Sequence, residues 1–145
     1  MDLIQHPLDL SAADLALLTR VPIAVARLDL EKRRWRGLGA DGREFGFDLD
    51  HPLHDGAVVC ATTSHAYVIA QAPEPVLEIA LGDAETSARL GWKIGNLHFP
   101  IEITPTAVRV TDDPALRQML EREQIPFVEK TAVFQPLKGL PHAHH

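Results

Sequence analysis

The stretch Gly-Trp-Lys-Ile-Gly-Asn-Leu-His-Phe-Pro, residues 91–100, decides how the second half of the chain folds. Asp83 is a suitable N-cap for a helix that runs into this stretch, and Gly95-Asn96 is a stop signal that is expected to end it. A strand is expected to begin at Phe99, so His98 stands between a helix and a strand. The residues that recur at helical spacing, and form one face of mostly small residues, are Ala84, Ala88, Gly91 and Ile94.

Strand-like and helix-like segments alternate on both sides of this stretch. Val76–Leu81 has the pattern of a strand, and Asp112-Asp113-Pro114 supplies a cap and a first-turn proline for a second helix that ends at Ile125-Pro126. The other expected strands are 99–104, 107–110 and 127–134. The buried stripe expected on the second helix consists of Leu116, Met119 and Leu120. The resulting order, β-α-β-β-α-β, is the split β-α-β or ferredoxin-like arrangement.

The first half of the chain predicts a β-rich domain of short strands and turns. Val21–Asp48 carries apolar and charged residues in partial alternation, and its Asp41-Gly42 pair is a strong signal for a two-residue hairpin turn. A second strand pair, 57–60 and 66–70, flanks the polar turn Thr62-Thr63-Ser64. The fold class expected for the whole chain is therefore α+β, with a β-rich N-terminal domain followed by a ferredoxin-like domain.

Gln71-Ala72-Pro73-Glu74-Pro75 marks the expected boundary between the two domains. Two prolines in three residues cannot continue a central strand and suit a stiff linker. The expected ranges are 1–72 for the first domain, 73–75 for the linker, 76–137 for the second domain and 138–145 for the tail. The tail is expected to be flexible, because its residues have nothing to pack against.

Composition argues against several classes of function. The 145 residues are 46% hydrophobic, which is enough for real cores, and 14 Lys and Arg against 20 Asp and Glu give a net charge of −6. A chain with this net negative charge lacks the excess of basic residues that is typical of a nucleic-acid-binding protein. Cys60 is the only cysteine, so neither an internal disulfide nor a thiolate cluster is expected. The chain shows no signal peptide and no apolar run near the ~20 residues of a membrane span, so a cytoplasmic protein is expected.

Histidine is the residue type in this sequence that suggests metal binding. The chain has eight histidines, and imidazole suits Ni²⁺, Cu²⁺ and Zn²⁺. Four of them lie in the second half, namely His98, His142, His144 and His145. The His-Ala-His-His end is a metal-binding pattern when it can move, although an expression-tag remnant or a neutral polar end gives the same letters. From the residues alone, the favoured interpretation of His98 is a half-buried histidine at the start of a strand, satisfied by a hydrogen bond.

The segment around His98 contains the sequence Gly95-Asn96-Leu97-His98-Phe99-Pro100-Ile101-Glu102-Ile103. Together with the helix before it, the β-β-α-β segments after it and the His-bearing tail, this segment resembles the UreE family of urease accessory nickel chaperones. The resemblance covers nearly the whole chain and implies a β-rich, peptide-binding-like domain before a ferredoxin-like metal-binding domain. It also implies a homodimer formed through the second domain, in which His98 meets its own copy across the two-fold axis.

The resemblance implies a function as well as a fold. The expected cargo is Ni²⁺, held by His98 from each subunit and by the tail histidines His142, His144 and His145, with Cu²⁺ or Zn²⁺ as ions bound in vitro. The expected activity is delivery of nickel for urease maturation, not catalysis. The expected partners are the urease apoprotein and its accessory proteins, including a GTPase.

Two departures from the family pattern qualify this expectation. Leu97 replaces the basic residue that usually precedes the histidine, and Thr111-Asp112-Asp113-Pro114 stands where some members carry further histidines. Two other functions remain open at this point. One is a general buffer or store for Ni²⁺, Cu²⁺ or Zn²⁺ without specific hand-over, and the other is a peptide-binding adaptor that uses only the first domain.

Three further candidates give weaker signals. His51-Pro52-Leu53-His54 between two aspartates has metal-binding residue types, but its proline and the following Asp-Gly favour a turn. Ser64-His65 suggests a nucleophile and a base, yet neighbours on a strand point to opposite faces, so no pairing is expected. Cys60 lies in an apolar strand and is expected to be inert core.

The run Glu31-Lys32-Arg33-Arg34-Trp35-Arg36 is the one basic segment. On a strand, Lys32, Arg34 and Arg36 share a face, which suits docking of an acidic protein surface. Charged side chains also protect an edge strand from aggregation, and the sequence favours neither explanation.

Overall fold

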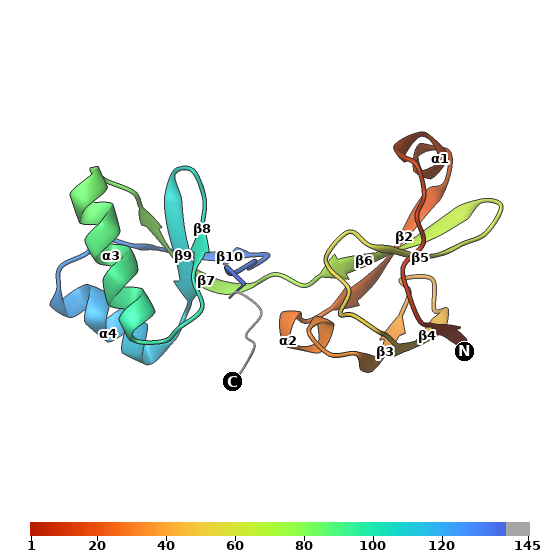
Figure 1. Ribbon diagram of the computed structural model, residues 1–145, viewed down its shortest axis with the longest axis horizontal. Coiled ribbons are helices and arrows are strands. Elements are labelled where there is room, and N and C mark those ends of the chain that lie inside the picture. Colours follow the sequence, from red (N-terminus) through yellow and green to blue (C-terminus); the bar gives the residue numbers. More distant parts are fainter. Residues whose placement is uncertain (139–145) are drawn as a thin grey trace. The chain divides into compact units, whose positions relative to one another are not determined.

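The structure, a computed structural model, describes residues 1–138 of the chain. The chain divides into two compact units between Ala72 and Pro73. Both units contain strands and helices, so the chain is a mixed α+β protein, as predicted (Figure 1). No helix within the described residues combines the length and the apolar character needed to cross a membrane. The predicted tail ligands His142, His144 and His145 lie outside the described residues.

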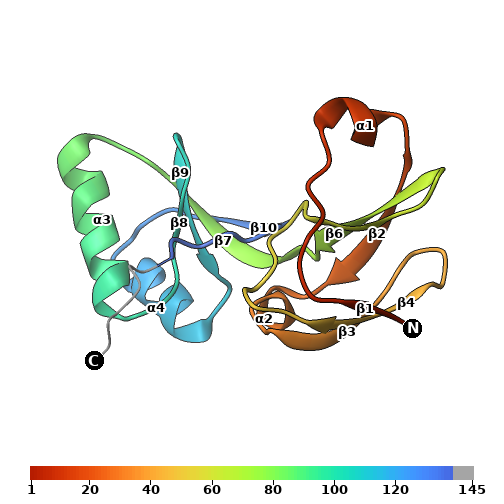
Figure 2. The same cartoon turned by 45° about the vertical axis from the view of Figure 1, so that its right-hand side comes forward.

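The first unit contains two three-stranded sheets, with the strand orders β1-β4-β3 and β2-β6-β5 (Figure 2). The strands are β1 (Asp2–Ile4), β2 (Thr19–Val25), β3 (Arg34–Leu38), β4 (Glu44–Asp48), β5 (Val58–Ala61) and β6 (His65–Gln71). The pairs β1-β4 and β2-β6 are parallel, whereas β3-β4 and β5-β6 are antiparallel hairpins. The predicted strand pairs on either side of the two polar turns are therefore confirmed.

The β3-β4 hairpin turns at the predicted place, but the turn is longer than the two residues expected: the Gly39 N–H donates to the carbonyl oxygen of Arg43 at 2.8 Å, with Ala40, Asp41 and Gly42 between them. Gly42 has φ +91°, which an L-residue adopts only with strain, and the Arg43 N–H donates to Asp41 Oδ1 at 3.1 Å. The register places Trp35 opposite Phe47, and their rings stack with centroids 3.9 Å apart. The buried core of the unit continues from Phe47 to Phe45 and Ile69.

Two short helices in the first unit were not expected from the sequence, namely α1 (Ala12–Ala16) and α2 (Arg27–Leu30). Ser11 caps α1, because its Oγ accepts the N–H of Asp14 at 3.1 Å. α1 buries none of its residues and α2 buries only Leu30. Neither helix is long enough to show a hydrophobic period, which is the signal that reveals helices in a sequence.

The second unit has the element order β-α-β-β-α-β. Its elements are β7 (Glu74–Ala80), α3 (Ala84–Asn96), β8 (Glu102–Ile103), β9 (Ala107–Thr111), α4 (Pro114–Arg122) and β10 (Val128–Ala132). The strand order is β10-β7-β9-β8 with every neighbouring pair antiparallel, which is a split β-α-β topology. The two helices pack on the same face of this sheet, since they share one apolar core with Leu77 and Val110 (Figure 1).

Both long helices begin where their caps predict. Asp83 Oδ1 accepts the N–H of Thr86 at 2.7 Å at the start of α3, and Asp113 Oδ1 accepts the N–H of Ala115 at 2.8 Å at the start of α4. The predicted stripe of α4 is buried. The predicted small-residue face of α3 is wrong in part, because the helix buries Leu90 and Ile94 and leaves its alanines exposed. Larger apolar side chains remove more surface from water, so they determine the buried side.

The junction between the units is shorter than the sequence suggests. β7 begins at Glu74, so Glu74 and Pro75 belong to a strand and not to a linker. Pro75 lacks an N–H but lies at the start of the strand, where this is tolerated. The Ala72 N–H donates to the carbonyl oxygen of Val25 at 2.8 Å, which ties it to the first unit. Only Pro73 is left between the two folded segments.

Candidate metal centre

His98 takes the left-handed position that ends helix α3. Its φ is +61°, and its N–H donates to the carbonyl oxygen of Gly95 at 3.0 Å. The sequence predicts Gly95-Asn96 for the helix stop, whereas the structure keeps both in the helix and makes Leu97 the C-cap. Left-handed backbone is uncommon for a residue with a side chain, although histidine adopts it more readily than most, and it is a usual way to end a helix. The helix therefore ends at the left-handed residue His98 and not at Gly95-Asn96.

The imidazole of His98 faces solvent on a segment that is held at both ends. His98 is exposed, and within residues 1–138 no hydrogen bond to its ring is found. The expected strand from Phe99 is wrong, since β8 begins at Glu102. The intervening Phe99 and Ile101 instead pack partly buried against the core of the second unit. This arrangement contradicts the reading of His98 as a half-buried histidine at the start of a strand.

Exposed apolar side chains lie close to His98 along the chain. Trp92 is 68% exposed, Leu97 is 44% exposed and Ile103 is 54% exposed. Trp92 is two residues from both Leu90 and Ile94, so it lies on the side of α3 opposite to their buried side. Sequence reasoning missed Trp92, although a tryptophan outside the apolar stripe of a helix was the available signal.

One chain does not build a metal site from its described part. Within residues 1–138, no group of three or more His, Cys, Asp or Glu side chains is placed to hold an ion. A site of three or more such ligands that included His98 would therefore need ligands from outside these residues. The His51-His54 segment is a loop that leads into the turn at Asp55-Gly56, and His54 Nδ1 lies 3.1 Å from the carbonyl oxygen of Asp55. The aspartate is also engaged, since its Oδ1 accepts the N–H of Gln71.

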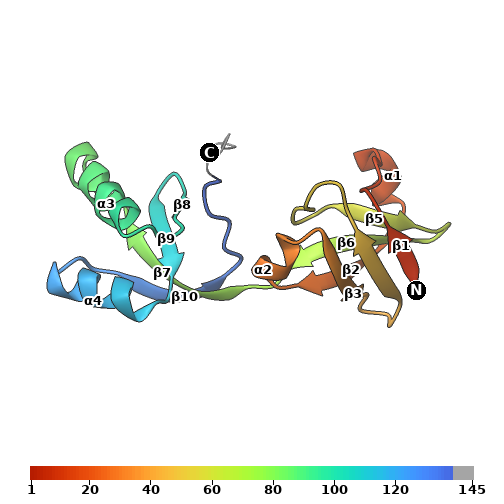
Figure 3. The ribbon, with the colours of Figure 1, turned by 60° about the horizontal axis from the view of Figure 1, so that its bottom comes forward.

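The segment after β10 turns back toward β8 (Figure 3). Phe134 is fully buried, and the Leu137 N–H donates to the carbonyl oxygen of Ile101 at 2.7 Å. Ile101 is three residues beyond His98. The structure thus brings the last described residues, up to Lys138, to the neighbourhood of the predicted ligand, which no local sequence pattern indicates.

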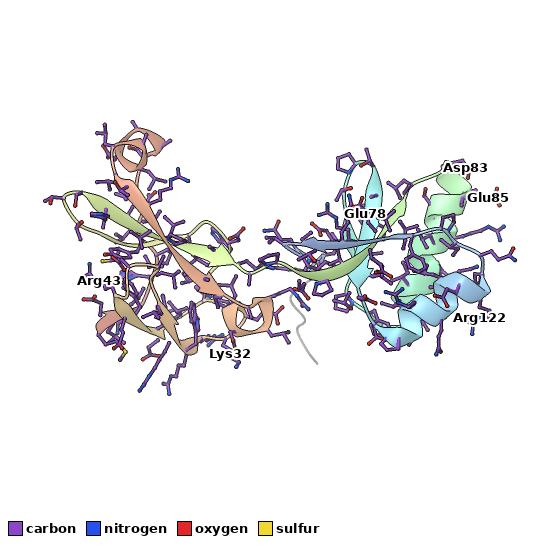
Figure 4. The ribbon with its side chains drawn as sticks, turned by 180° about the vertical axis from the view of Figure 1, so that it is seen from behind. Lys32, Arg43, Glu78, Asp83, Glu85 and Arg122 are labelled. Carbon is purple, nitrogen blue, oxygen red and sulfur yellow. The ribbon has the colours of Figure 1, made fainter. Side chains whose placement is uncertain are left out.

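A row of charged side chains crosses the sheet face opposite the helices and includes β8. Glu78 accepts from Lys130 Nζ at 2.7 Å and from Arg109 Nε at 2.8 Å, and Arg109 lies 3.7 Å from Glu102 (Figure 4 labels Glu78). The ammonium of Lys130 first, and then the guanidinium of Arg109, hold the pKa of the Glu78 carboxyl below its ordinary value. The row joins all four strands, so it supports the short strand that follows the His98 loop.

The structure corrects the prediction for Ser64 and His65. Ser64 Oγ lies 2.6 Å from His65 Nδ1, although the two were expected to point apart. Ser64 is in the turn before β6, where strand alternation does not apply. The serine is exposed, and no carboxylate hydrogen-bonds the histidine among the described residues, so the pair does not form a triad. Cys60 is partly buried at the edge of the first core.

Residues 74–145 match the family described as UreE urease accessory protein, C-terminal domain. The chain is 34% identical over 110 residues to the urease accessory protein UreE of Beijerinckia indica subsp. indica, covering 74% of this chain and 64% of that relative. It is 32% identical over 122 residues to the UreE of Bradyrhizobium sp. strain ORS 278, covering 80% and 58%.

A third relative is covered over a similar share of both chains. The chain is 33% identical over 130 residues to the urease accessory protein UreE of Pseudomonas putida strain GB-1, covering 81% of this chain and 77% of the relative. It spans less than two thirds of the length of the relatives from Beijerinckia and Bradyrhizobium. These matches extend through both structural units, and the chain belongs to the UreE family of urease accessory proteins.

Proposed function

We propose that this chain is a nickel-binding metallochaperone that delivers Ni²⁺ for maturation of the urease active site. The name shared by its relatives supports a role in urease maturation. The observation that carries the proposal is His98, an exposed imidazole on a left-handed helix end next to exposed apolar surface. The activity is metal hand-over and not catalysis, and the ion is the cargo of the protein.

A homodimer of the second unit supplies the second imidazole. In a two-fold contact a residue near the axis meets its own copy, so one exposed His98 per chain becomes a pair. Trp92, Leu97 and Ile103 give this surface apolar area that a second copy can cover. Two imidazoles leave a nickel ion short of ligands, because Ni²⁺ takes square-planar or octahedral geometry in nitrogen and oxygen sites.

The tail histidines supply the remaining ligands in this proposal. The Leu137–Ile101 hydrogen bond starts the tail beside the His98 loop. His142 is four residues and His145 is seven residues beyond Lys138, and an extended chain covers up to about 3.5 Å per residue. A reach of roughly 14 to 25 Å is enough to bring an imidazole to the His98 pair. Ligands on such a tether can dissociate one at a time, which allows hand-over to the urease apoprotein or to an accessory protein such as the GTPase.

Calorimetric titration with Ni²⁺ tests this function. The proteins compared are the intact chain, His98→Ala, a chain that ends at Leu140, and the matched control His51→Ala, which removes an exposed histidine from the first unit. We expect about one tight ion per dimer, lost in His98→Ala, weakened in the truncated chain and unchanged in the control. Several ions per dimer with no dependence on His98 would instead identify a metal store, and Cu²⁺ and Zn²⁺ titrations rank the ions.

A further inference from the structure

The second unit contains a pocket of about 360 Å³ that is lined by helix α3, the end of β7 and the loop after helix α4. Ile79 of β7 and Leu90 of α3 line its inner part, since both are almost fully buried. Ile125 and Pro126 line it from the loop that leads to β10. Small-molecule sites are usually concave and mostly apolar, with a few polar groups and a volume of about 300 Å³ or more, and this pocket has those properties.

The loop that lines the pocket is fixed by the way helix α4 ends. The Ile125 N–H donates to the carbonyl oxygen of Leu120 at 2.8 Å, and the Gln124 N–H donates to that of Glu121 at 3.1 Å. These two hydrogen bonds form the Schellman pattern that commonly closes a helix. Figure 4 labels Arg122, the last residue of α4 before this loop. The pocket is therefore bordered by hydrogen-bonded backbone on both sides and is already formed without a ligand.

Gln124 occupies the left-handed position of this helix end, with φ +57°. Glycine is the usual residue there, because a side chain makes this backbone conformation unfavourable. The glutamine also borders the pocket, and no hydrogen bond of its side chain is found within residues 1–138. A glutamine at this position therefore strains the backbone and gives the pocket an amide group that glycine would not supply.

Two opposite charges stand side by side at the pocket. Lys93 Nζ donates to Glu123 Oε2, and each of the two side chains stays 34% exposed. This hydrogen bond and the charge of Lys93 hold the pKa of the Glu123 carboxyl below its ordinary value, so the carboxyl is ionised at neutral pH. An ammonium has three donors and a carboxylate has two acceptor oxygens, so both groups keep capacity for a ligand. Arg89, which also lines the pocket, is paired with Glu85 at 2.8 Å.

We propose that this pocket binds a free amino acid with a branched apolar side chain. The carboxylate of the ligand pairs with Lys93 and the Gln124 amide, its ammonium pairs with Glu123, and its side chain fills the buried part of the pocket. A zwitterion fits better than a singly charged ligand, because a lone carboxylate would be repelled by Glu123 and a lone ammonium by Lys93. The pocket does not include His98, so the proposal does not depend on the nickel site.

Nuclear magnetic resonance on the isotope-labelled full-length chain tests this proposal, with L-leucine as the probe. Three compounds each lack one part of leucine: isocaproate lacks the ammonium, isoamylamine lacks the carboxylate, and glycine lacks the apolar side chain. We expect leucine to shift the backbone amide signals of Leu90, Gln124 and Ile125 and to saturate at millimolar concentrations or below. Each comparison compound should bind at least about fivefold more weakly, because it leaves a charged group or the apolar surface without its partner.

Variants of the two charged residues should exchange the preference between ligands. Glu123→Gln should weaken the binding of leucine and tighten that of isocaproate, because the repelling carboxylate is gone. Lys93→Gln should likewise weaken leucine and tighten isoamylamine. A loss of folded structure cannot tighten binding, so these gains separate recognition from stability. Glu121→Gln removes an exposed carboxylate of α4 outside the pocket and should change the affinity for either compound by less than about twofold.

Gln124→Gly separates binding from stability in the opposite direction. It removes the backbone strain, so the urea concentration at the midpoint of unfolding should rise. It also removes the amide, so the affinity for leucine should fall. A more stable chain that binds leucine more weakly is the result that a purely structural glutamine would not give.

Four results would overturn the proposal. Isocaproate or isoamylamine that binds the intact chain as tightly as leucine would mean that the pocket selects only apolar shape. Equal weakening by Glu123→Gln and Glu121→Gln would reduce the effect to overall charge. Signal changes that avoid Leu90 and Ile125 would place leucine elsewhere on the chain. The absence of any saturable change would show that the pocket does not hold this class of ligand.

Discussion

Leu137 and Ile101 are joined by a 2.7 Å hydrogen bond from the N–H of the first to the carbonyl oxygen of the second. Thirty-six positions separate them along the chain, yet one lies just before the tail and the other just after His98. Phe134, which is fully buried, holds the same returning segment against the second unit. In the proposed function this contact fixes where the tail starts, and therefore how often its histidines encounter the His98 pair.

Replacing Phe134 should weaken nickel binding without touching a ligand. Phe134→Ala removes the side chain that holds the returning segment, so the effective concentration of the tail histidines falls and Ni²⁺ affinity should drop by roughly three- to tenfold. Calorimetry measures the affinity, and hydrogen exchange at the Leu137 amide reports release of the segment. Phe134→Leu should restore most of both, and Leu137→Ala, which changes a 62% exposed side chain and keeps the N–H, is the control. Full affinity combined with fast exchange at Leu137 would show that the position of the tail start is irrelevant.

Glycine and alanine at position 98 should separate stability from metal binding. Both His98→Gly and His98→Ala remove the imidazole, so both should lose tight Ni²⁺ binding. At φ +61° glycine is unstrained and alanine is not, so His98→Gly should be more stable than His98→Ala by about 1 kcal/mol. Urea unfolding monitored by circular dichroism measures the difference. Equal stability of the two variants would argue against a left-handed backbone at this position.

A charge placed at Trp92 should prevent self-association. Trp92→Glu puts a carboxylate on the exposed side of α3, which the proposal assigns to contact with a second copy, so the protein should sediment as a monomer and bind Ni²⁺ more weakly. Leu17→Glu makes a comparable change at an exposed apolar position of the first unit and should leave the sedimentation unchanged. A dimer that tolerates Trp92→Glu would place the contact elsewhere on the second unit.

Acid should destabilise the second unit partly through Glu78. Lys130 and Arg109 lower the pKa of Glu78 from its ordinary value of 4.5 in the folded protein. A lowered folded-state pKa contributes stability that is present above the unfolded pKa and is lost as the pH falls through the folded pKa. When the pH is lowered below about 4.5, the urea concentration at the midpoint of unfolding should therefore decrease. In Glu78→Gln this decrease should be smaller. Glu121→Gln is the control, since Glu121 has no ion pair within the described residues. An unchanged pH profile in Glu78→Gln would assign the acid sensitivity to other carboxylates.

Features set by neighbouring residues could be predicted from the sequence. The Asp41-Gly42 hairpin and the starts of both long helices at Asp83 and Asp113 depend on local capping and turn chemistry, and the structure has all three. The same holds for the buried stripe of α4, because its period appears directly in the sequence. The antiparallel pairing of β3 and β4 follows from the turn between them.

Features set by distant contacts could not be predicted. The burial of Phe134 and the Leu137–Ile101 hydrogen bond need the folded sheet, and no local pattern announces them. His98 ends its helix although Gly95 and Asn96 are the better stop residues, and the residues that follow it, Phe99 and Ile101, pack against the core through contacts that no local pattern indicates. The strand that follows, β8, is only Glu102–Ile103, shorter than predicted. For His98, the sequence indicated the residue type but not its exposure.

The short junction between the two units has a consequence for proteolysis. Proteases cleave segments that can leave the folded structure over several residues, and exposed loop tips are their usual targets. Here Ala72 is hydrogen-bonded to Val25 and β7 starts at Glu74, which leaves Pro73 as the only residue outside both folded segments. Trypsin or subtilisin should therefore fail to release either unit as an intact fragment, and isolated units for binding studies must be made by expression instead of digestion.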